Sequence, residues 1–282
     1  ELLNRKQDIQ ELLESPETSA ELKRKLKLVE SVRTFASERM GLPDNAAYTA
    51  YVDLGRPFVT MVVTAAMPLE LKAQKWCYWF VGCQEYRGYF DEADAEVFAL
   101  EMKEQKLDVS VGGVSAYSTL GWLNKPWLPN YFSDPVLSTF LLKNDAELIA
   151  TLIHEMAHQI VYVNNDTAFN ESFAVFVEQE GLRQFLDEAE KSKFIESKVE
   201  KTYQWYLSAR KDRILFRKLV KTTFDKMEIL FAKNFPDSEK LQKKQQLFNE
   251  LRENYMSRKE EFQVLSYGNW FAKKLNNSHL LG

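Results

Sequence analysis

The spacing of hydrophobic residues divides the chain into helical and strand-like stretches. Apolar residues recur every three or four positions over residues 22–35, and Gly41-Leu42-Pro43 follows, which predicts an amphipathic helix and its end. Between residues 48 and 89, β-branched and aromatic runs are interrupted by Gly, Pro and Asp, a texture that predicts strands. The two clearest strand-like runs cover residues 57–63 and 76–81.

After residue 89, the spacing of hydrophobic residues is first helical and then strand-like. Residues 90–105 return to helical spacing, and residues 107–117 are strand-like apart from an interruption at Gly112 and Gly113. Residues 123–135 contain three prolines, so this stretch is predicted to be a loop.

Two helices are predicted to follow this loop. Asn144 precedes Glu147 by three residues, which resembles a helix-capping arrangement, and apolar spacing continues the first helix to about Val163. The second helix is predicted to open near Thr167 and to stop at Gly181.

The C-terminal third of the chain is predicted to be helical and highly charged. One long amphipathic helix passes through residues 216–231, and another covers residues 241–262. The charge balance changes sign near residue 183, from 16 basic against 27 acidic residues before it to 21 against 14 from there on. We therefore expect two subregions, residues 1–182 and residues 183–282, with the second packing on the first.

The overall composition restricts the class of protein. The chain has 282 residues, of which 45% are hydrophobic and 13% aromatic, and this excludes disordered and collagen-like classes. A net charge of −4 argues against a nucleic-acid binder, which must neutralise a row of phosphates. The longest uncharged run, residues 109–124, contains several glycines and serines, so no transmembrane helix is predicted.

Residues 154–158 read His-Glu-Met-Ala-His, which fits the zincin pattern H-E-x-x-H inside a predicted helix. Residues four apart lie about 40° apart around a helix, so His154 and His158 point the same way and can bind one metal ion. Glu155 lies on the adjoining face, where it can reach a water molecule on that metal. With only three histidines in the chain, a chance match has a probability of roughly 0.002. A second alternative to a metal site is that the two histidines lie on the surface of a helix and bind no metal.

A catalytic zinc ion takes three protein ligands and keeps one position open. The only other histidine is His279, and the spacing H-E-x-x-H-x-x-G-x-x-H is absent, so an acidic third ligand is predicted. The candidate is Glu171, thirteen residues after His158 and early in the next predicted helix, within Asn-Glu-Ser-Phe-Ala. The alternative for Glu171 is a solvated carboxylate stabilised by the helix dipole.

Three more residues are candidates for supporting roles. Glu178 follows Glu171 by two helical turns and is predicted to orient a ligand histidine, the alternative being an exposed charge. Zincins bind the substrate backbone along an edge strand, for which residues 111–122 are the candidate. Tyr117 in this run is predicted to donate a hydrogen bond to the oxyanion, or else to be a packed strand residue. His279 could take the same role, or be a solvated terminal histidine.

The motif and the predicted elements together indicate an α+β fold. We expect a zincin-like catalytic region, consisting of a small mixed sheet and the active-site helix, with a helical N-terminus and a helical C-terminal extension. One Zn²⁺ per chain is expected to be held by His154, His158 and Glu171. Glu155 is expected to act as the general base in the hydrolysis of a peptide bond.

Cys77 and Cys83 are the two cysteines, with five residues between them. They can form one disulfide if a hairpin turns near Gly82, but two cysteines alone do not decide the redox compartment. The chain begins at Glu1, without an initiator Met or an apolar signal segment, so we expect a segment upstream of it.

The motifs resemble those of known metallopeptidases. His-Glu-x-x-His at 154–158 and Asn-Glu-x-Phe-Ala-x-x-x-Glu at 170–178 are similar to the motifs of gluzincins, particularly zinc aminopeptidases of the aminopeptidase N type, in which the gap is longer. The chain more closely resembles the bacterial predicted aminopeptidase family over residues 34–182. The matching stretches are residues 42–45, 76–77, 82–83, 86–90, 116–122, 154–159 and 166–174.

This resemblance implies a peptide substrate, and the aminopeptidase specificity rests on it alone. Members of the family look exported, often with a lipoprotein-like start, which implies a periplasmic location or membrane anchoring through a missing N-terminal segment. That location permits a disulfide between Cys77 and Cys83. The family also continues beyond the point that matches residues 276–280. Glu85 and Glu178 are candidates for capturing the α-ammonium group of a substrate.

The sequence is also compatible with two other functions. A zinc endopeptidase would use the same chemistry without a free substrate amine. The positively charged C-terminal helices also suit a partner-binding or chaperone-like regulator with a structural or vestigial metal site. The intact Glu155 argues against the regulator, because a purely structural site does not need a general base.

Overall fold

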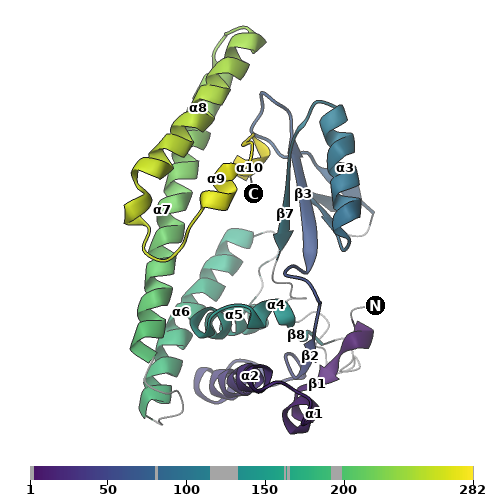
Figure 1. Cartoon of the computed structure of the whole chain (residues 1–282), viewed down its shortest axis with the longest axis vertical. Coiled ribbons are helices and arrows are strands. Elements are labelled where there is room, and N and C mark those ends of the chain that lie inside the picture. Colours follow the sequence, from purple (N-terminus) through teal and green to yellow (C-terminus); the bar gives the residue numbers. More distant parts are fainter. Residues whose placement is uncertain are drawn as a thin grey trace. The chain divides into compact units, whose positions relative to one another are not determined.

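The chain forms two compact units, which together contain both helices and small sheets. The computed structural model describes residues 3–79, 82–114, 133–161, 163, 166–191 and 199–281. Unit 1 consists of Glu1–Val59 and Ser115–Tyr206, and unit 2 of Thr60–Val114 and Leu207–Gly282. The predicted α+β class is confirmed (Figure 1). The change in charge near residue 183 falls inside helix α6 (Thr167–Lys191) and coincides with no limit of either unit.

Three helices make up the helical layer of unit 1. Helix α5 (Asp145–Ala157) packs against both α2 (Ala20–Met40) and α6 (Figure 1). The helix predicted over residues 22–35 is confirmed as α2. It ends at Gly41, whose φ of 68° is a left-handed conformation that favours glycine.

Charged side chains hold the start of α5 to α2. The carboxylate of Asp145 lies 2.7 Å from Nη1 of Arg24 and 2.8 Å from Nζ of Lys25. The buried Lys25 also donates to the carbonyl oxygen of Lys143, 2.7 Å away. Because Asp145 lies in the first turn of α5, its negative charge also interacts favourably with the helix dipole.

A glycine lets α6 approach its neighbours closely. A Cβ atom on Gly181 would lie 2.6 Å from Cε of Met40 and 3.0 Å from Cγ2 of Ile153, so a larger residue would force a shift. The prediction that the helix stops at Gly181 is wrong, since α6 continues to Lys191. This glycine thus lies close to side chains of α2 and α5 and does not end the helix.

Short elements complete unit 1. Strands β1 (Gln7–Asp8), β2 (Ala50–Val52) and β8 (Val136–Leu137) form a sheet in the order β1-β2-β8, with β2 antiparallel to β1 and parallel to β8. The short helices are a 3₁₀ helix at Leu3–Arg5, α1 (Ile9–Glu14) and α4 (Ser138–Leu141). Helix α7 (Val199–Ala232) begins in this unit, and its later part belongs to unit 2.

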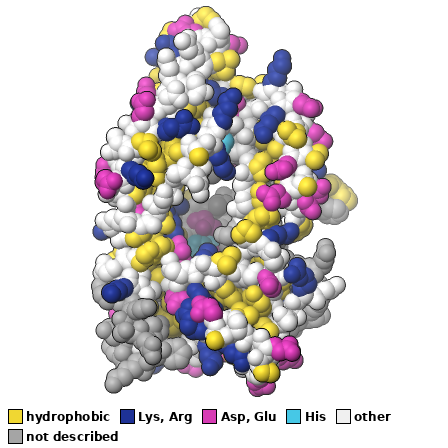
Figure 2. All heavy atoms as spheres, in the orientation of Figure 1, with side chains coloured by type: hydrophobic (Ala, Val, Ile, Leu, Met, Phe, Trp, Pro, Cys, Tyr) yellow, Lys and Arg dark blue, Asp and Glu magenta, His cyan; other side chains and the backbone are white. Residues whose placement is uncertain are grey.

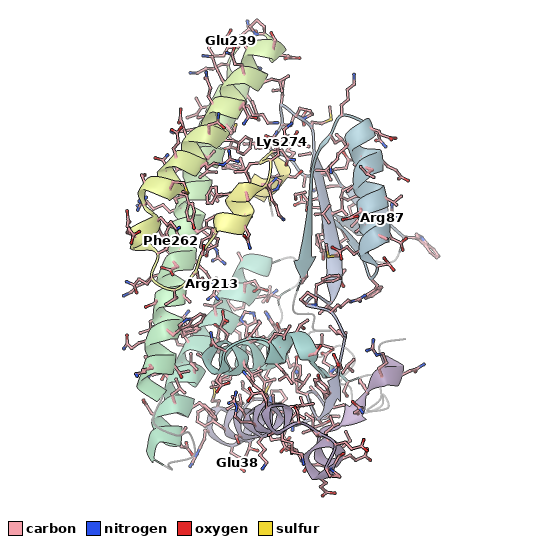
Figure 3. The ribbon with its side chains drawn as sticks, in the orientation of Figure 1. Glu38, Arg87, Arg213, Glu239, Phe262 and Lys274 are labelled. Carbon is pink, nitrogen blue, oxygen red and sulfur yellow. A yellow bond between two sulfur atoms is a disulfide. The ribbon has the colours of Figure 1, made fainter. Side chains whose placement is uncertain are left out.

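Unit 2 is built around an antiparallel sheet. Strands β6 (Arg87–Tyr89), β3 (Thr60–Ala66) and β7 (Asp108–Val114) pair in the order β6-β3-β7. Helix α3 (Glu92–Glu104) packs on one side of β3 and β7, and α10 (Ser278–Leu281) lies on the other (Figure 1). The guanidinium of Arg87, a residue labelled in Figure 3, lies over the ring of Phe98 on α3, 4.6 Å from the ring centroid.

These elements confirm the helix predicted over residues 90–105, whereas the bounds of two predicted strands differ from those observed. The strand predicted at 57–63 starts at Thr60 and continues to Ala66. The described part of the run predicted at 107–117 is β7, and residues 115–117 lie outside the described residues.

A disulfide closes a separate hairpin of unit 2. Strands β4 (Trp76–Tyr78) and β5 (Gly82–Gln84) are antiparallel, with Cys77 directly opposite Cys83, and the two sulfur atoms are bonded. The disulfide that the sequence left open is therefore present. The strand predicted at 76–81 ends at Tyr78.

The helices of unit 2 share an apolar core of their own. Helix α8 (Asp237–Ser257) and the second part of α7 pack around buried residues that include Met227, Phe248 and Tyr255. A 3₁₀ helix (Lys259–Glu261) and α9 (Gly268–Ala272) follow α8. The helix predicted over 241–262 therefore ends at residue 257, and the C-terminal third is not helical throughout. Charged side chains of both signs are scattered along α8 on the face seen in Figure 2.

Buried polar groups fix the C-terminal residues of unit 2 to its sheet. The side-chain amide of Asn277 donates to three carbonyl oxygens, of Met67, Pro68 and Glu70, each 3.0 Å away. The carboxylate of Asp108 at the start of β7 accepts from the backbone N–H of Asn277 and from the ammonium of Lys244. These contacts join segments far apart in sequence. No helix of the described residues is both long and apolar enough to cross a membrane.

Candidate metal centre

The helix that carries the two neighbouring histidines begins as predicted and ends early. The side chain of Asn144 accepts the backbone N–H of Glu147 at 2.9 Å, so the predicted cap of α5 is confirmed. The helix ends at Ala157 and does not continue to Val163, because the next N–H groups bond three residues back and tighten the chain into a turn. His154 therefore lies in the last turn of α5, with His158 at its C-cap.

Three side chains converge where α5 ends and α6 begins. Nε2 of His154 and Nε2 of His158 are 3.1 Å apart. One carboxylate oxygen of Glu171 lies 3.4 Å from Nε2 of His154, and the other lies 3.6 Å from Nε2 of His158. These ligand atoms all lie within 4.8 Å of one another and could hold a metal ion. The structure thus brings the three predicted ligands together.

The position of Glu171 follows from the way α6 begins. The side chain of Asp166 accepts the N–H of Phe169 at 2.9 Å, as an N-cap residue does. The buried side chain of Asn170 both donates to the carbonyl of Val163 (2.9 Å) and accepts its N–H (2.8 Å). Asn170 therefore ties Val163 to α6, and Glu171 is the next residue.

Glu178 is the partner of one ligand histidine. Its Oε2 lies 2.9 Å from Nδ1 of His154, and its Oε1 accepts a hydrogen bond of 2.7 Å from the hydroxyl of Tyr206. With Nδ1–H donating to Glu178, a neutral His154 presents the lone pair of Nε2 toward Glu171 and His158. This is the orientation that a metal ligand requires.

Charge and burial act differently on the two histidines. Burial disfavours the charged form of His154, but the hydrogen bond to Glu178 and the charges of Glu155, Glu178 and Glu171 outweigh it and raise the pKa of His154. Burial lowers the pKa of His158, and the neighbouring His154 lowers it further. His158 is therefore held neutral, as a ligand must be.

Glu155 lies beside the cluster without belonging to it. It is half-buried on α5, next to His154 in the chain, and its charge contributes to the raised pKa of that histidine. The metal-binding group found among the described residues consists of the two histidines and Glu171. Glu155 is thus not among the clustered ligands, and its role as a general base stays a prediction.

A supporting contact near His158 was not predicted. The side-chain amide of Asn45 donates to Oε1 of Gln159 at 2.8 Å, and two carbonyl groups near Asn45 accept from Arg33 of α2. The segment after α2 is therefore joined to the residue that follows the second histidine. Residues 42–45 and Gln159 are both in stretches that resemble the aminopeptidase family, but no spacing rule connects them.

The remaining predicted residues are not part of the cluster. Tyr117 lies outside the described residues. The described part of the predicted substrate strand, β7, is an edge strand, but it belongs to unit 2 and the ligands to unit 1, so this role stays a prediction. Glu85 forms an ion pair of 3.3 Å with Lys75. Both oxygens of Glu178 are hydrogen-bonded, which makes it a poor acceptor for a substrate amine.

His279 is half-buried in unit 2 and contacts Trp270, so it is not the freely solvated terminal histidine of the alternative expectation. Its Nδ1 lies 2.9 Å from the side-chain oxygen Oδ1 of Asn276, and its ring meets that of Trp270 edge to face. Burial, with a contribution from Lys273, lowers the pKa of His279 to about 4.

This shift predicts a loss of stability in mild acid. Since an unfolded histidine titrates near 6.5, the unfolded chain binds a proton at residue 279 between pH 6.5 and about 4, and the folded chain does not. The free energy of unfolding should therefore fall as the pH falls through this window, and His279→Gln should make the fall smaller. Urea unfolding at pH 7 and pH 4.5 measures both. An NMR titration of folded protein in which His279 ionises near pH 6.5 would contradict the assignment.

Comparison with known proteins identifies the family. A family model described as "Putative aminopeptidase" matches residues 1–282. Searches of curated proteins and of solved structures find no match. The description of the family suggests a hydrolase that acts on peptides, in agreement with the resemblance of the sequence motifs. The chain belongs to the putative aminopeptidase family.

Proposed function

We propose that the protein is a zinc-dependent peptidase, and specifically an aminopeptidase. The observation that carries the proposal is the closeness of the three ligand groups: the two Nε2 atoms are 3.1 Å apart, and one oxygen of Glu171 lies 3.4 Å from His154 while the other lies 3.6 Å from His158. Ligands about 2.0–2.1 Å from a tetrahedral zinc ion are about 3.3 Å from one another, so the two nitrogens and the carboxylate fit this metal. Two histidines and one glutamate are also a known ligand set of catalytic zinc, which keeps a fourth position open.

The residues of the chain have distinct roles in this proposal. When bound, zinc polarises the carbonyl of the peptide bond and lowers the pKa of a water molecule toward about 7. Glu155 accepts the proton from the attacking water and passes it to the leaving amine. Glu178 holds the Nδ1–H of His154 and so fixes the direction of Nε2. Tyr117 is proposed as the hydrogen-bond donor to the oxyanion.

The location proposed for the protein is the periplasm, free or anchored to the membrane on that side. The resemblance to an exported family supports it. The disulfide between Cys77 and Cys83 is consistent with it, because structural disulfides persist in oxidising compartments. Labelling of the thiols in cell fractions, with and without prior reduction, tests this proposal.

The exopeptidase assignment predicts a strict need for a free substrate amine. Peptides with free N-termini should be shortened one residue at a time, and the same peptides with acetylated N-termini should be resistant. Mass spectrometry of the digests measures both. Equal cleavage of the two sets at internal bonds would replace the aminopeptidase with a zinc endopeptidase. Zinc binding without any cleavage would favour a regulator with a structural metal site.

A further inference from the structure

A buried tyrosine lies behind the ligand cluster. Tyr206, near the start of α7, is only 4% exposed, and its hydroxyl donates to Oε1 of Glu178 over 2.7 Å. The other oxygen of Glu178 receives the Nδ1–H of His154 at 2.9 Å. A chain of two hydrogen bonds therefore runs from α7 through α6 to the histidine on α5, entirely within unit 1.

Each member of this chain limits the freedom of the next. A carboxylate held at one oxygen only can rotate about its last side-chain bond, and its direction toward a histidine is then poorly fixed. The Tyr206 hydroxyl occupies Oε1, so Oε2 is the oxygen that faces His154. Glu178 is itself largely buried, with 17% of its side chain exposed, so few other partners compete for its oxygens.

The hydrogen bond at Nδ1 decides which nitrogen of His154 is available to a metal. In a neutral His154 whose Nδ1–H donates to Glu178, Nε2 carries no proton, and this Nε2 lies 3.1 Å from Nε2 of His158. His158 differs, because its buried Nδ1 has no hydrogen-bond partner among the described residues. Among those residues, His154 is thus the ligand whose tautomer is set by the protein.

We propose that Tyr206 is a positioning residue of the metal site, which strengthens metal binding by fixing Glu178 and, through it, the orientation and tautomer of His154. This inference rests on the zinc binding in the proposed function. According to this inference, α7 contributes a residue that supports the metal site. The ligand motifs on α5 and α6 do not indicate such a residue.

Zinc affinity of the full-length protein tests the proposal. Tyr206→Phe removes the hydroxyl and keeps the ring, so it should weaken zinc binding by about 10-fold, the lower end of the cost of losing a residue that supports a metal ligand. Competition with a chromophoric chelator measures the affinity. Because Tyr206 acts through Glu178, adding Tyr206→Phe to a Glu178→Ala variant should cause no further loss.

A matched control separates positioning from general destabilisation. Tyr255 is a buried tyrosine of unit 2, 1% exposed, whose hydroxyl accepts the N–H of Tyr267 at 2.9 Å. Tyr255→Phe also removes one buried hydrogen bond, and it should leave zinc affinity unchanged. An equal loss of affinity in both variants would overturn the proposal, as would unchanged affinity in Tyr206→Phe.

A spectroscopic measurement on metal-free protein gives a second readout. In wild-type protein, ¹⁵N shifts should show the neutral form of His154 with its proton on Nδ1, and Tyr206→Phe should increase the share with the proton on Nε2. An unchanged tautomer ratio would overturn the proposal. If the wild-type protein bound no zinc, the proposed function would fail, whereas this ratio would still decide whether Tyr206 positions the ring.

Discussion

Replacement of His158 by alanine is expected to remove zinc from the protein. Its Nε2 is one of three clustered ligand atoms, and its side chain is 4% exposed, so no outside group can easily take its place. Loss of a residue that merely supports a ligand costs about 10- to 100-fold in metal affinity, so loss of the ligand itself should cost more than about 100-fold. His154→Ala and Glu171→Ala should act in the same direction. Metal analysis after dialysis measures the zinc left per chain.

The third histidine supplies the control for this experiment. His279 lies in unit 2 and is absent from the metal-binding group found among the described residues. His279→Ala should therefore keep its zinc. Zinc retained in His158→Ala, or lost in His279→Ala, would show that the ligand set is different.

Replacement of Glu155 by glutamine is expected to stop peptide hydrolysis while zinc stays bound. Glutamine has nearly the same shape but cannot accept a proton, and a positioned general base contributes about 10²- to 10⁴-fold to the rate. The fall in kcat/KM should be of this size. A kinetic assay and a metal analysis on the same preparation are both needed, because the prediction concerns the combination.

Another glutamate of α5 provides a matched control. Glu147 lies two turns before Glu155 and interacts with the capping residue Asn144, a contact that glutamine can keep. Glu147→Gln should have wild-type activity. Loss of zinc in Glu155→Gln would make Glu155 a ligand, and full activity in that variant would remove it from the mechanism.

The local elements could be predicted because their signals are local. The i, i+4 spacing of His154 and His158 requires only that residues 145–157 be helical, and the apolar period and the Asn144 cap indicate that helix. The two cysteines face each other because a short hairpin places them in register. In each case the residues that interact are a few positions apart.

The ends of some helices could not be predicted, because the same residue type occurs in more than one structural context. Gly181 is typical of a helix stop, yet it lies within α6, where the side chains of Met40 and Ile153 pack close to it. Apolar residues after Ala157 continue the helical spacing although the backbone has already tightened into a turn. Periodicity alone does not distinguish these outcomes.

Contacts between distant segments were the least predictable. Residues 60–114 join residues 207–282 through specific pairs, such as Asp108 with Lys244, that leave no periodic signal. The hydrogen bond from Tyr206 to Glu178 spans 28 residues and two helices. The ligands themselves could be predicted from their motif, whereas the residues that support them could not.

The central claim, that hydrolysis depends on one zinc ion held by the chain, is tested most directly by titrating zinc into chelator-treated protein. Peptide hydrolysis should be absent after chelation and should return in proportion to added zinc, reaching its maximum at about one zinc per chain. Hydrolysis that survives complete removal of the metal, or that does not return when zinc rebinds, would contradict the account.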